Sequence, residues 1–372
     1  MKVAISGTGL YTPNQSISND ELVESFNAWV DMFNAEHADE IEAGKVAPKQ
    51  KSSSEFIEKA SGIKSRYVID KSGILDPERM VPIIPERPDD EAGLQCEMSV
   101  VAARQALEEA GKTSDDVDAV IVACSNLERP YPAVAVEVQQ ALGIDGFGYD
   151  MNVACSSATF GLQAAVNAVQ TGQARAVLVI SPEICTGHLN FRDRDSHFIF
   201  GDACTAVLVE ALSEAKPESS FEVVSARLKT RYSNMIRNNF GFLNRADESR
   251  QGLPDKLFVQ QGRKVFKEVV PLVASMMSRH LAECELAPSD IKRMWLHQAN
   301  LSMNLLISKK VLGREATREE SPVILDTYAN TSSAGSVIAF HHYKSDFREG
   351  DIGVLCSFGA GYSAGSVILR KC

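Results

Sequence analysis

The chain has 372 residues, of which 44% are hydrophobic and 23% charged, the composition of a globular protein large enough for two domains or one layered core. The formal net charge of −11 argues against nucleic acid as a partner, because binding to phosphate requires a basic surface. Apolar runs such as 176–180 are too short to span a bilayer, and the N-terminal segment lacks the long apolar core of a signal peptide. We therefore expect a cytoplasmic protein with no membrane partner.

The cysteines and histidines indicate neither a disulfide framework nor a metal site. The eight cysteines show no CxxC spacing, and the seven histidines show no HExxH pattern. We expect a protein with free thiols and no bound metal.

Short apolar segments alternate with amphipathic ones along the chain. The pattern predicts strands and helices that together imply sheets buried on both faces. The predicted strands are 3–5, 120–123, 177–180 and 354–356, and the predicted helices include 157–170 and 265–283. Residues 21–100 interrupt the alternation with a helical insert at 21–43 and a Pro- and charge-rich loop at 76–90. That loop is either a solvated connection or an active-site lid.

A weak internal repeat indicates that the chain contains two related halves. Residues 106–126 align with residues 280–300 without gaps at an offset of 174, and 173–181 resemble 350–358 at nearly the same offset. Each longer copy has the pattern of an amphipathic helix, an acidic turn and an apolar strand. Chance similarity is the alternative, but two repeats in the same order favour duplication. We expect an N-terminal half at 1–215 and a C-terminal half at 216–372.

The segment NVACSS places Cys155 between a predicted strand at 148–153 and the helix at 157–170. A thiol at this position faces free N–H groups and the positive end of the helix dipole. The sequence therefore predicts a lowered thiol pKa and donors for an oxyanion. Taken alone, a cysteine before a helix is more often structural.

Three further segments carry polar or glycine-rich patterns. His297 follows an apolar strand in MWLHQAN, where an open sheet exposes residues at its carboxyl edge. Asn330 lies in YANTSSAGS, a loop of small residues before a predicted helix near 336–343, and SFGAGYSAGS occupies 357–366. Each segment has a structural explanation by itself: a buried histidine, a capped helix start and a tight connection between strands.

The order NVACSS, FGDA, HQAN, NTSSAGS and FGAGYSAGS resembles the β-ketoacyl-acyl-carrier-protein synthase III family of the thiolase-like superfamily. The resemblance covers the chain apart from insertions within 21–100 and around 235–255. It implies an α/β protein with the thiolase-like fold, in which two duplicated halves pack as a five-layer αβαβα sandwich. It also implies an acyltransferase of fatty acid biosynthesis with the catalytic residues Cys155, His297 and Asn330.

The resemblance also implies a role for each catalytic residue. Cys155 would take an acyl group from coenzyme A, after which malonyl-acyl carrier protein loses CO2. His297 and Asn330 would stabilise the enolate as two neutral donors, without a metal. The backbone N–H groups of Cys155 and Ala360 would form a second oxyanion hole. Ala360 stands where the family usually has Gly, and we expect its methyl group to narrow the site. Acyl-coenzyme A and malonyl-acyl carrier protein are substrates, so no cofactor is implied.

Coenzyme A would bind at residues that depart in part from the family pattern. Phe56 stands at the usual Trp position, Arg194 matches the Arg on the other side of the adenine, and Ala60 replaces a nearby Arg. Binding of coenzyme A is therefore expected to be weakened or rearranged, unless Phe56 is simply a core residue. Gly262 and Phe358 are further expected substrate-binding positions.

The acidic acyl carrier protein would dock on a basic rim formed by Lys267, Lys309 and Lys310. Ser302 replaces the Arg that the family usually has at this entrance, so we expect altered docking geometry. The alternative is that these lysines form an ordinary solvated face.

Tyr131, in NLERPYP, matches the residue that crosses a homodimer interface to line the neighbour's acyl pocket. Together with Gln260 and Gln261 it suggests a primer other than acetyl, and the resemblance of NLERPYP to longer-chain members of the family implies a medium-chain acyl primer. One alternative is head-to-head condensation of two acyl thioesters without decarboxylation, with Glu128 near the position of a base supplied across the interface. A non-catalytic heterodimer scaffold is a second alternative, which the intact triad disfavours. A cysteine hydrolase is a third, and it leaves Asn330 unexplained.

Overall fold

A computed structural model describes residues 1–239 and 241–372; residue 240, inside the insertion predicted around 235–255, lies outside the described part. The strands are β1 (Val3–Tyr11), β2 (Gln15–Ser18), β3 (Ser65–Val68), β4 (Ala119–Ala123), β5 (Phe147–Met151), β6 (Ala176–Ile184), β7 (Asp202–Ala211), β8 (Phe221–Ser233), β9 (Ile236–Arg237), β10 (Val259–Gln260), β11 (Ile291–Leu296), β12 (Ile352–Gly359) and β13 (Gly361–Lys371). The α-helices are α1 (Asn19–Glu36), α2 (Ala38–Glu42), α3 (Ser54–Ser61), α4 (Ser72–Leu75), α5 (Leu94–Ala110), α6 (Val134–Leu142), α7 (Ser157–Gln170), α8 (Gly262–Glu283), α9 (Leu301–Leu312), α10 (Leu325–Tyr328) and α11 (Ala334–His342).

The main sheet contains the same four-strand pattern twice. Its strand order is β11-β12-β13-β8-β1-β7-β6-β4-β5. In each half the first pair is parallel (β4 with β6, β11 with β12) and the next two pairs are antiparallel. The predicted repeats correspond to α5 followed by β4 and to α8 followed by β11, which confirms the duplication. The predicted boundary between residues 215 and 216 stays a prediction; it falls just before β8.

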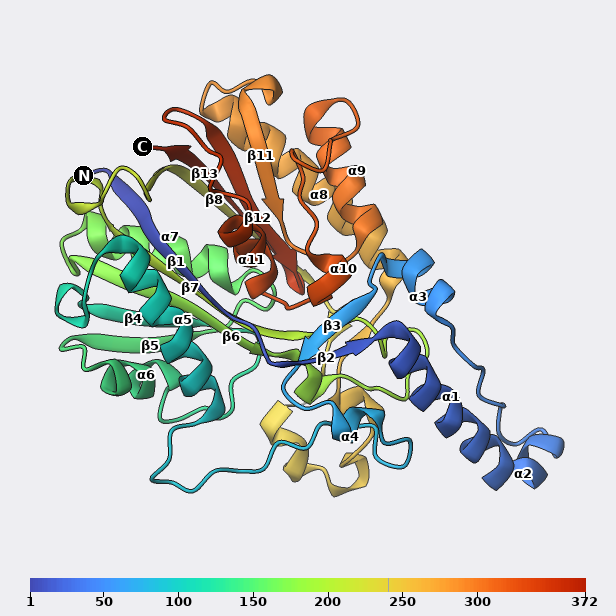
Figure 1. Ribbon diagram of the computed structural model, residues 1–372. Helices are drawn as coiled ribbons and strands as arrows, with labels where there is room; N and C mark the ends of the chain where they lie inside the picture. Colours follow the sequence, from blue (N-terminus) through green and yellow to red (C-terminus); the bar gives the residue numbers. More distant parts are fainter. Residues whose placement is uncertain (240) are drawn as a thin grey trace.

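Helices cover and separate the two halves of the sheet, and Figure 1 shows this layering. One apolar cluster joins α5 and α6 to the N-terminal half, and another joins α8 and α9 to the C-terminal half. The central cluster surrounds α7 and α11 between the halves. These are the five layers of the predicted αβαβα sandwich. Small residues on α7 allow close packing: a Cβ on Gly161 would lie 2.8 Å from Cγ1 of Val179.

The helical insert predicted at 21–43 corresponds to α1 and α2, which project from the body of the molecule (Figure 1). A capping box between Ser18 and Glu21 starts α1. The buried face of α1, which includes Phe26 and Trp29, packs in a fourth apolar cluster with α3, β3 and residues 185–200. The loop at 76–90 contains neither helix nor strand, and none of its residues lines the catalytic cavity described below.

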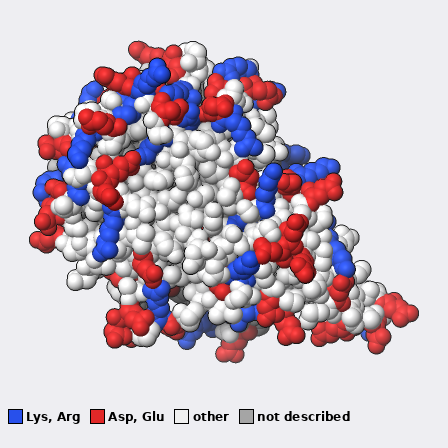
Figure 2. Space-filling view, viewed as in Figure 1, with Lys and Arg blue, Asp and Glu red and all other residues white. Residues whose placement is uncertain are grey.

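Charged side chains of both signs share the surface of the described chain (Figure 2). Figure 2 shows acidic and basic side chains mixed around the rim of one face, with a broad uncharged area at its centre. That face carries no extended basic patch of the kind that nucleic acid requires. Among the described residues, no helix combines the length and apolar character needed to cross a bilayer.

Candidate active site

A cavity of about 460 Å³ lies where both halves of the sheet end, between α3 and the first turns of α8 and α9. Cys155, His297 and Asn330 all line it. Cys155 comes from the N-terminal half, and His297 and Asn330 come from the C-terminal half. The remaining walls are largely apolar and include Ile199, Phe200, Phe258, Val265, Phe266, Val269, Met303 and Phe358. The structure therefore brings together the three residues that the sequence predicted to be catalytic.

Cys155 lies in the turn between β5 and α7, whose bounds are those predicted for the helix. The preceding Ala154 has φ 49°, a left-handed conformation that is costly for a residue with a Cβ. The side chain of Asn152 holds this turn: its Oδ1 accepts from the Ala154 N–H at 2.9 Å, and its Nδ2 donates to the Ser125 carbonyl at 2.8 Å. The position of the thiol is therefore set both by this hydrogen-bonded turn and by the start of α7.

Burial raises the pKa of the Cys155 thiol to about 11, so the predicted lowering is wrong. The hydroxyl of Ser332 and the backbone N–H groups of Ala360 and Cys155 favour the thiolate, while the charge of Glu183 opposes it. Cys155 is half-buried, and removal of its thiol from water outweighs the favourable donors. The resting nucleophile is therefore a neutral thiol.

The two predicted backbone donors do face the nucleophile. The N–H groups of Cys155 and Ala360 both stabilise negative charge at the sulfur, the orientation that an oxyanion hole requires. Their role as an oxyanion hole stays a prediction. Ala360 also lines a separate surface depression with Thr230 and Tyr232 and is absent from the cavity lining. Its methyl group therefore does not narrow the catalytic cavity, contrary to expectation.

His297 directly follows β11 and is almost fully buried, with 1% of its surface exposed. Its backbone N–H donates to the Cys356 carbonyl at 2.8 Å, and its ring meets Phe358 edge-on with centroids 5.2 Å apart. Burial lowers the pKa of His297 to about 4, with the nearby Ser332 carbonyl opposing the shift. The imidazole is neutral at physiological pH, so it can donate a hydrogen bond without carrying a charge.

Asn330 is held by the FGDA segment and by its own loop. Its backbone N–H donates to the Ile199 carbonyl at 3.0 Å, and its own carbonyl accepts from the Gly201 N–H at 3.2 Å. Its Oδ1 accepts from the Ser332 N–H at 2.9 Å, which leaves the Nδ2 group as the donor directed to the cavity. Asn330 and His297 therefore present two neutral donors.

Strained backbone concentrates at these two loops. Five non-glycine residues in the described chain have positive φ, and three of them are Ala154, Ala329 (54°) and Ser332 (49°). Each such residue costs on the order of 1–3 kcal/mol and persists only where the surroundings enforce it. Here the enforced conformations precede Cys155 and flank Asn330.

Comparison with known proteins agrees with this geometry. Residues 149–231 match 3-oxoacyl-[acyl-carrier-protein] synthase III, and residues 281–371 match the C-terminal part of the same family. A β-ketodecanoyl-[acyl-carrier-protein] synthase of Pseudomonas aeruginosa is 66% identical over 94% of this chain and 100% of the relative. The chain belongs to the 3-oxoacyl-[acyl-carrier-protein] synthase III family. The protein is therefore an acyltransferase with the thiolase-like fold.

More distant members of the family cover the chain equally well. The β-ketoacyl-[acyl-carrier-protein] synthase III of Granulibacter bethesdensis is 30% identical over 98% of both chains. The crystal structure of 3-oxoacyl-(acyl carrier protein) synthase III from Pseudomonas aeruginosa PAO1 superimposes with a TM-score of 0.77 at 23% identity, covering 100% of this chain and 98% of that one. This structural likeness shows the shared fold.

Phe56 and Arg194, which were expected to bind coenzyme A, do not line the cavity themselves, although Ala60 and Asp195 near them in the sequence do. Phe56 is on α3, and the Arg194 guanidinium lies 4.1 Å from its ring centroid. Arg194 also donates from Nε to the Lys51 carbonyl at 2.8 Å. An adenine between two stacking partners needs roughly 7 Å between them, twice a van der Waals spacing. The Phe56–Arg194 pair is therefore closed, and its role with adenine stays a prediction.

The other predicted substrate residues divide into two groups. Gly262 and Phe358 line the cavity. Tyr131 does not: its side chain is 82% exposed and distant from the cavity lining of its own chain. An exposed position is what reaching into a neighbouring subunit requires, and that role stays a prediction.

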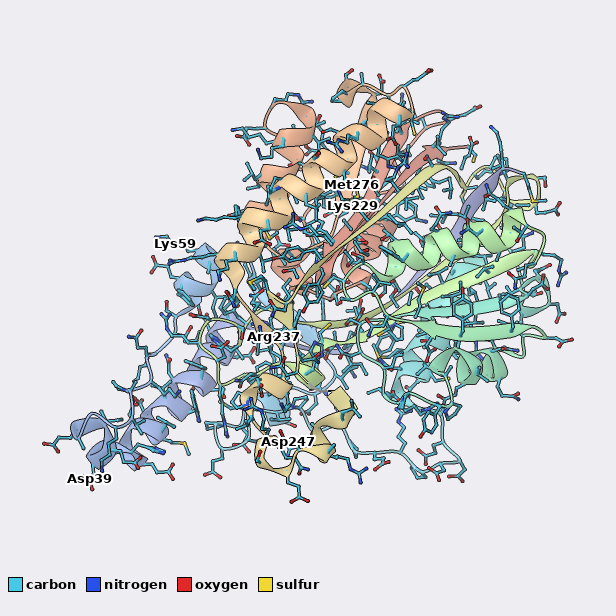
Figure 3. All side chains as sticks on the ribbon, turned by 180° about the vertical axis from the view of Figure 1, so that it is seen from behind. Asp39, Lys59, Lys229, Arg237, Asp247 and Met276 are labelled. Carbon is cyan, nitrogen blue, oxygen red and sulfur yellow. The ribbon has the colours of Figure 1, made fainter. Side chains whose placement is uncertain are left out.

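The predicted docking lysines are not equivalent. Lys267 lines the cavity mouth, Lys310 is exposed, and Lys309 forms an ion pair with Glu315 at 2.6 Å. Seen from behind, the first turn of α8 lies between α3, which carries Lys59, and β9, which carries Arg237 (Figure 3). Carrier-protein docking at these lysines stays a prediction.

Sequence reasoning missed three residues of the site. Gly359 packs directly against Cys155, the Ser332 hydroxyl favours the thiolate of Cys155, and Arg263 lines the cavity mouth beside Lys267. Gly359 and Ser332 lie inside segments already recognised as motifs. Arg263 follows Gly262 directly and could have been found as part of the basic start of α8.

Proposed function

We propose that the protein joins a medium-chain acyl primer, delivered by coenzyme A, to malonyl-acyl carrier protein and releases a β-ketoacyl-acyl carrier protein. The observation that carries this proposal is the convergence of Cys155, His297 and Asn330 in one apolar cavity. A nucleophile beside two neutral donors is the arrangement that a covalent condensation at an acyl thioester requires.

In the first half of the proposed reaction, Sγ of Cys155 attacks the primer carbonyl. The bond from that carbonyl to the sulfur of coenzyme A breaks, and the departing thiolate takes up the proton lost by Cys155. The N–H groups of Cys155 and Ala360 stabilise the negative oxygen of the tetrahedral intermediate. A neutral resting thiol is compatible with this step because its proton leaves as the new bond forms.

In the second half, malonyl-acyl carrier protein loses CO2, and the released electron pair generates an enolate at its thioester. The imidazole of His297 and the Nδ2 group of Asn330 donate to the enolate oxygen. The enolate carbon then attacks the acyl-cysteine carbonyl and expels the Cys155 thiolate, which takes up a proton from solvent. Apart from that proton, every atom comes from the two substrates, so the proposal includes no cofactor.

The medium-chain preference rests on the most similar relative described above. That protein is a β-ketodecanoyl-[acyl-carrier-protein] synthase, whose ten-carbon product contains two carbons from malonyl and eight from the primer. The apolar walls of the cavity, including Phe200, Phe258 and Phe266, suit a hydrocarbon substrate better than a polar one.

The carrier protein is proposed to dock at the start of α8. Arg263, Lys264 and Lys267 are exposed there, and no ion pair is recorded for them within the described residues. Lys309 and Lys310 extend the basic rim on α9, although Glu315 partly neutralises Lys309. Unpaired cations in a chain of net charge −11 favour an acidic partner at this place.

A homodimer in the cytoplasm completes the proposal. Tyr131 is too exposed to serve its own cavity, and β5 lies at the edge of the main sheet, where its outer side is available to a second copy. Tyr131 would then line the acyl pocket of the neighbouring subunit.

The head-to-head alternative is not favoured by the position of Glu128. Its carboxylate accepts a hydrogen bond from the Gln95 N–H, and its own N–H donates to Oε1 of Gln95 at 2.8 Å. The side chain is therefore held against α5 of its own subunit instead of extending toward a neighbour.

Intact-protein mass spectrometry tests the proposal directly. Incubation with acetyl-, octanoyl- and dodecanoyl-coenzyme A is expected to give the fastest acylation with octanoyl, and Cys155→Ser is expected to remove the labile thioester adduct. Malonyl-acyl carrier protein should then discharge the adduct as a β-ketoacyl product. A clear preference for acetyl would refute the primer assignment, and product from acyl-coenzyme A alone would establish the head-to-head reaction.

A further inference from the structure

Glu183 is a carboxylate with no exposed surface at the end of β6, next to the catalytic cavity. It accepts hydrogen bonds from two segments that are far apart in sequence. Ser125 donates from its N–H at 3.0 Å and from its hydroxyl at 2.6 Å. Ser333 donates from its N–H at 3.1 Å and also contacts the carboxylate through its hydroxyl. Both carboxylate oxygens are thus engaged.

Each of these two serines leads to a catalytic residue. The Ser125 carbonyl accepts from Nδ2 of Asn152, whose Oδ1 accepts from the N–H of Ala154, the residue before Cys155. Ser333 lies three positions after Asn330, in the strained loop at the start of α11. One buried group therefore connects the turn that carries the nucleophile with the loop that carries the amide donor.

We propose that Glu183 is a positioning residue that fixes the Cys155 turn and the Asn330 loop relative to each other. The inference rests on the proposed function for the roles of Cys155 and Asn330. It goes beyond that function by assigning the group that aligns the two halves of the protein at the reacting atoms.

An ionised carboxylate accepts all of these hydrogen bonds from Ser125 and Ser333 with the strength of a charged acceptor. In Gln, Oε1 would keep the backbone N–H groups of Ser125 and Ser333 only through weaker, uncharged bonds, and the NH2 group would be satisfied only if the Ser125 hydroxyl reversed and accepted from it. An unsatisfied buried donor costs about 1–3 kcal/mol. In Glu183→Gln we therefore expect the Ser125 and Ser333 contacts to weaken, with displacement of the attached loops.

The titratable groups that face Glu183 are thiols. Sγ of Cys185 lies 3.9 Å from Oε2, and the charge of Glu183 raises the pKa of Cys124, Cys155, Cys185 and Cys204. Burial raises the pKa of Glu183 itself, and its hydrogen bonds to the two serines oppose that shift. Removing the charge therefore favours the Cys155 thiolate while it loosens the two loops.

Loss of the Glu183 charge is expected to favour the Cys155 thiolate and to loosen the two loops. These opposite effects on reactivity distinguish a positioning role from general structural damage. In Glu183→Gln, alkylation of Cys155 by iodoacetamide at pH 8 is expected to be unchanged or faster. Decarboxylation of malonyl-acyl carrier protein by the acylated enzyme is expected to fall at least about tenfold, roughly 1.4 kcal/mol. Equal loss of both rates would overturn the inference. The matched control is Glu109→Gln, which removes a carboxylate that joins Thr8 and Lys344 away from the cavity.

Two variants that each remove one serine partner of Glu183 keep the test decisive if Glu183→Gln does not fold. Ser333→Ala is expected to slow decarboxylation more than acylation, and Ser125→Ala is expected to slow acylation more than decarboxylation. If both serine variants lost the same fractions of acylation and of decarboxylation, the proposal that Glu183 links the Cys155 turn to the Asn330 loop would be contradicted. A wild-type enzyme that neither acylates Cys155 nor decarboxylates malonyl-acyl carrier protein would instead refute the proposed function.

Discussion

Gly359 and Cys155 are in direct contact: a Cβ placed on Gly359 would lie 2.5 Å from Cβ of Cys155 and 2.9 Å from its Sγ. The end of β12, from the C-terminal half, therefore packs directly against the Cys155 side chain. Because even a methyl group cannot be accommodated without movement, Gly359→Ala should displace the thiol. We expect acylation of Cys155 to fall by at least about tenfold, roughly 1.4 kcal/mol in activation free energy. Gly187→Ala is the control, since its methyl group would meet only Ile184, at 3.9 Å.

The Ser332 hydroxyl should control the reactivity of the thiol. With a pKa of about 11, alkylation of Cys155 is expected to rise about tenfold per pH unit between pH 7 and 10. Ser332 favours the thiolate, so Ser332→Ala should raise the pKa further and slow alkylation roughly fivefold at each pH, the equivalent of about 1 kcal/mol. A plateau below pH 9 would contradict a buried neutral thiol. Ser336→Ala, which also removes a buried hydroxyl, serves as the control.

The basic start of α8 should govern the affinity for the carrier protein. Arg263→Glu and Lys267→Glu are each expected to raise the KM for malonyl-acyl carrier protein about fivefold at low ionic strength, and less at high salt, because surface charge pairs are screened. Arg279→Glu reverses a charge near the other end of the same helix and should leave KM unchanged. Equal effects from all three substitutions would indicate a general charge effect and exclude local docking.

The order of short motifs in the sequence was sufficient to identify the fold and to predict three residues, Cys155, His297 and Asn330, that line one cavity. Helix α7 has the predicted bounds because its pattern and its cap are local. The thiol pKa was predicted with the wrong sign because the burial of Cys155 depends on Ser332 and Gly359, which come from the other half of the chain. Glu183 escaped notice for the same reason: its serine partners lie 58 and 150 positions away in the sequence. Local patterns identify reactive residue types, but contacts between the halves determine their ionisation.

The closed pair of Arg194 and Phe56 should open when adenine binds. We expect Arg194→Ala to raise the KM for octanoyl-coenzyme A by roughly fivefold, since a cation–π contact contributes about 1 kcal/mol. The KM for octanoyl-pantetheine, which has no adenine, should not change. Phe56→Trp offers a larger ring and is expected to lower the KM for octanoyl-coenzyme A. An equal effect of Arg194→Ala on both substrates would exclude adenine recognition by this pair.

His297 should make the protein less stable in mild acid. Its pKa is about 4 in the folded protein and about 6.5 when unfolded, so the unfolded state binds a proton first as the pH falls. The contribution of His297 is therefore neutral at pH 7, becomes destabilising below about pH 6.5 and reaches its limit near pH 4. At pH 5 the loss is about 2 kcal/mol, from 1.36 kcal/mol for each pH unit below 6.5.

Urea denaturation at pH 7 and pH 5 measures this contribution. His297→Gln is expected to reduce the difference in unfolding free energy between the two pH values by about 2 kcal/mol and to abolish condensation. His280 is also buried with a pKa of about 4, but it contacts Ser366 away from the cavity. His280→Gln should therefore reduce the acid sensitivity by a similar amount while condensation persists. An unchanged pH difference in His297→Gln would show that burial does not lower the pKa of the imidazole, which would contradict the buried, neutral state of this residue at pH 5.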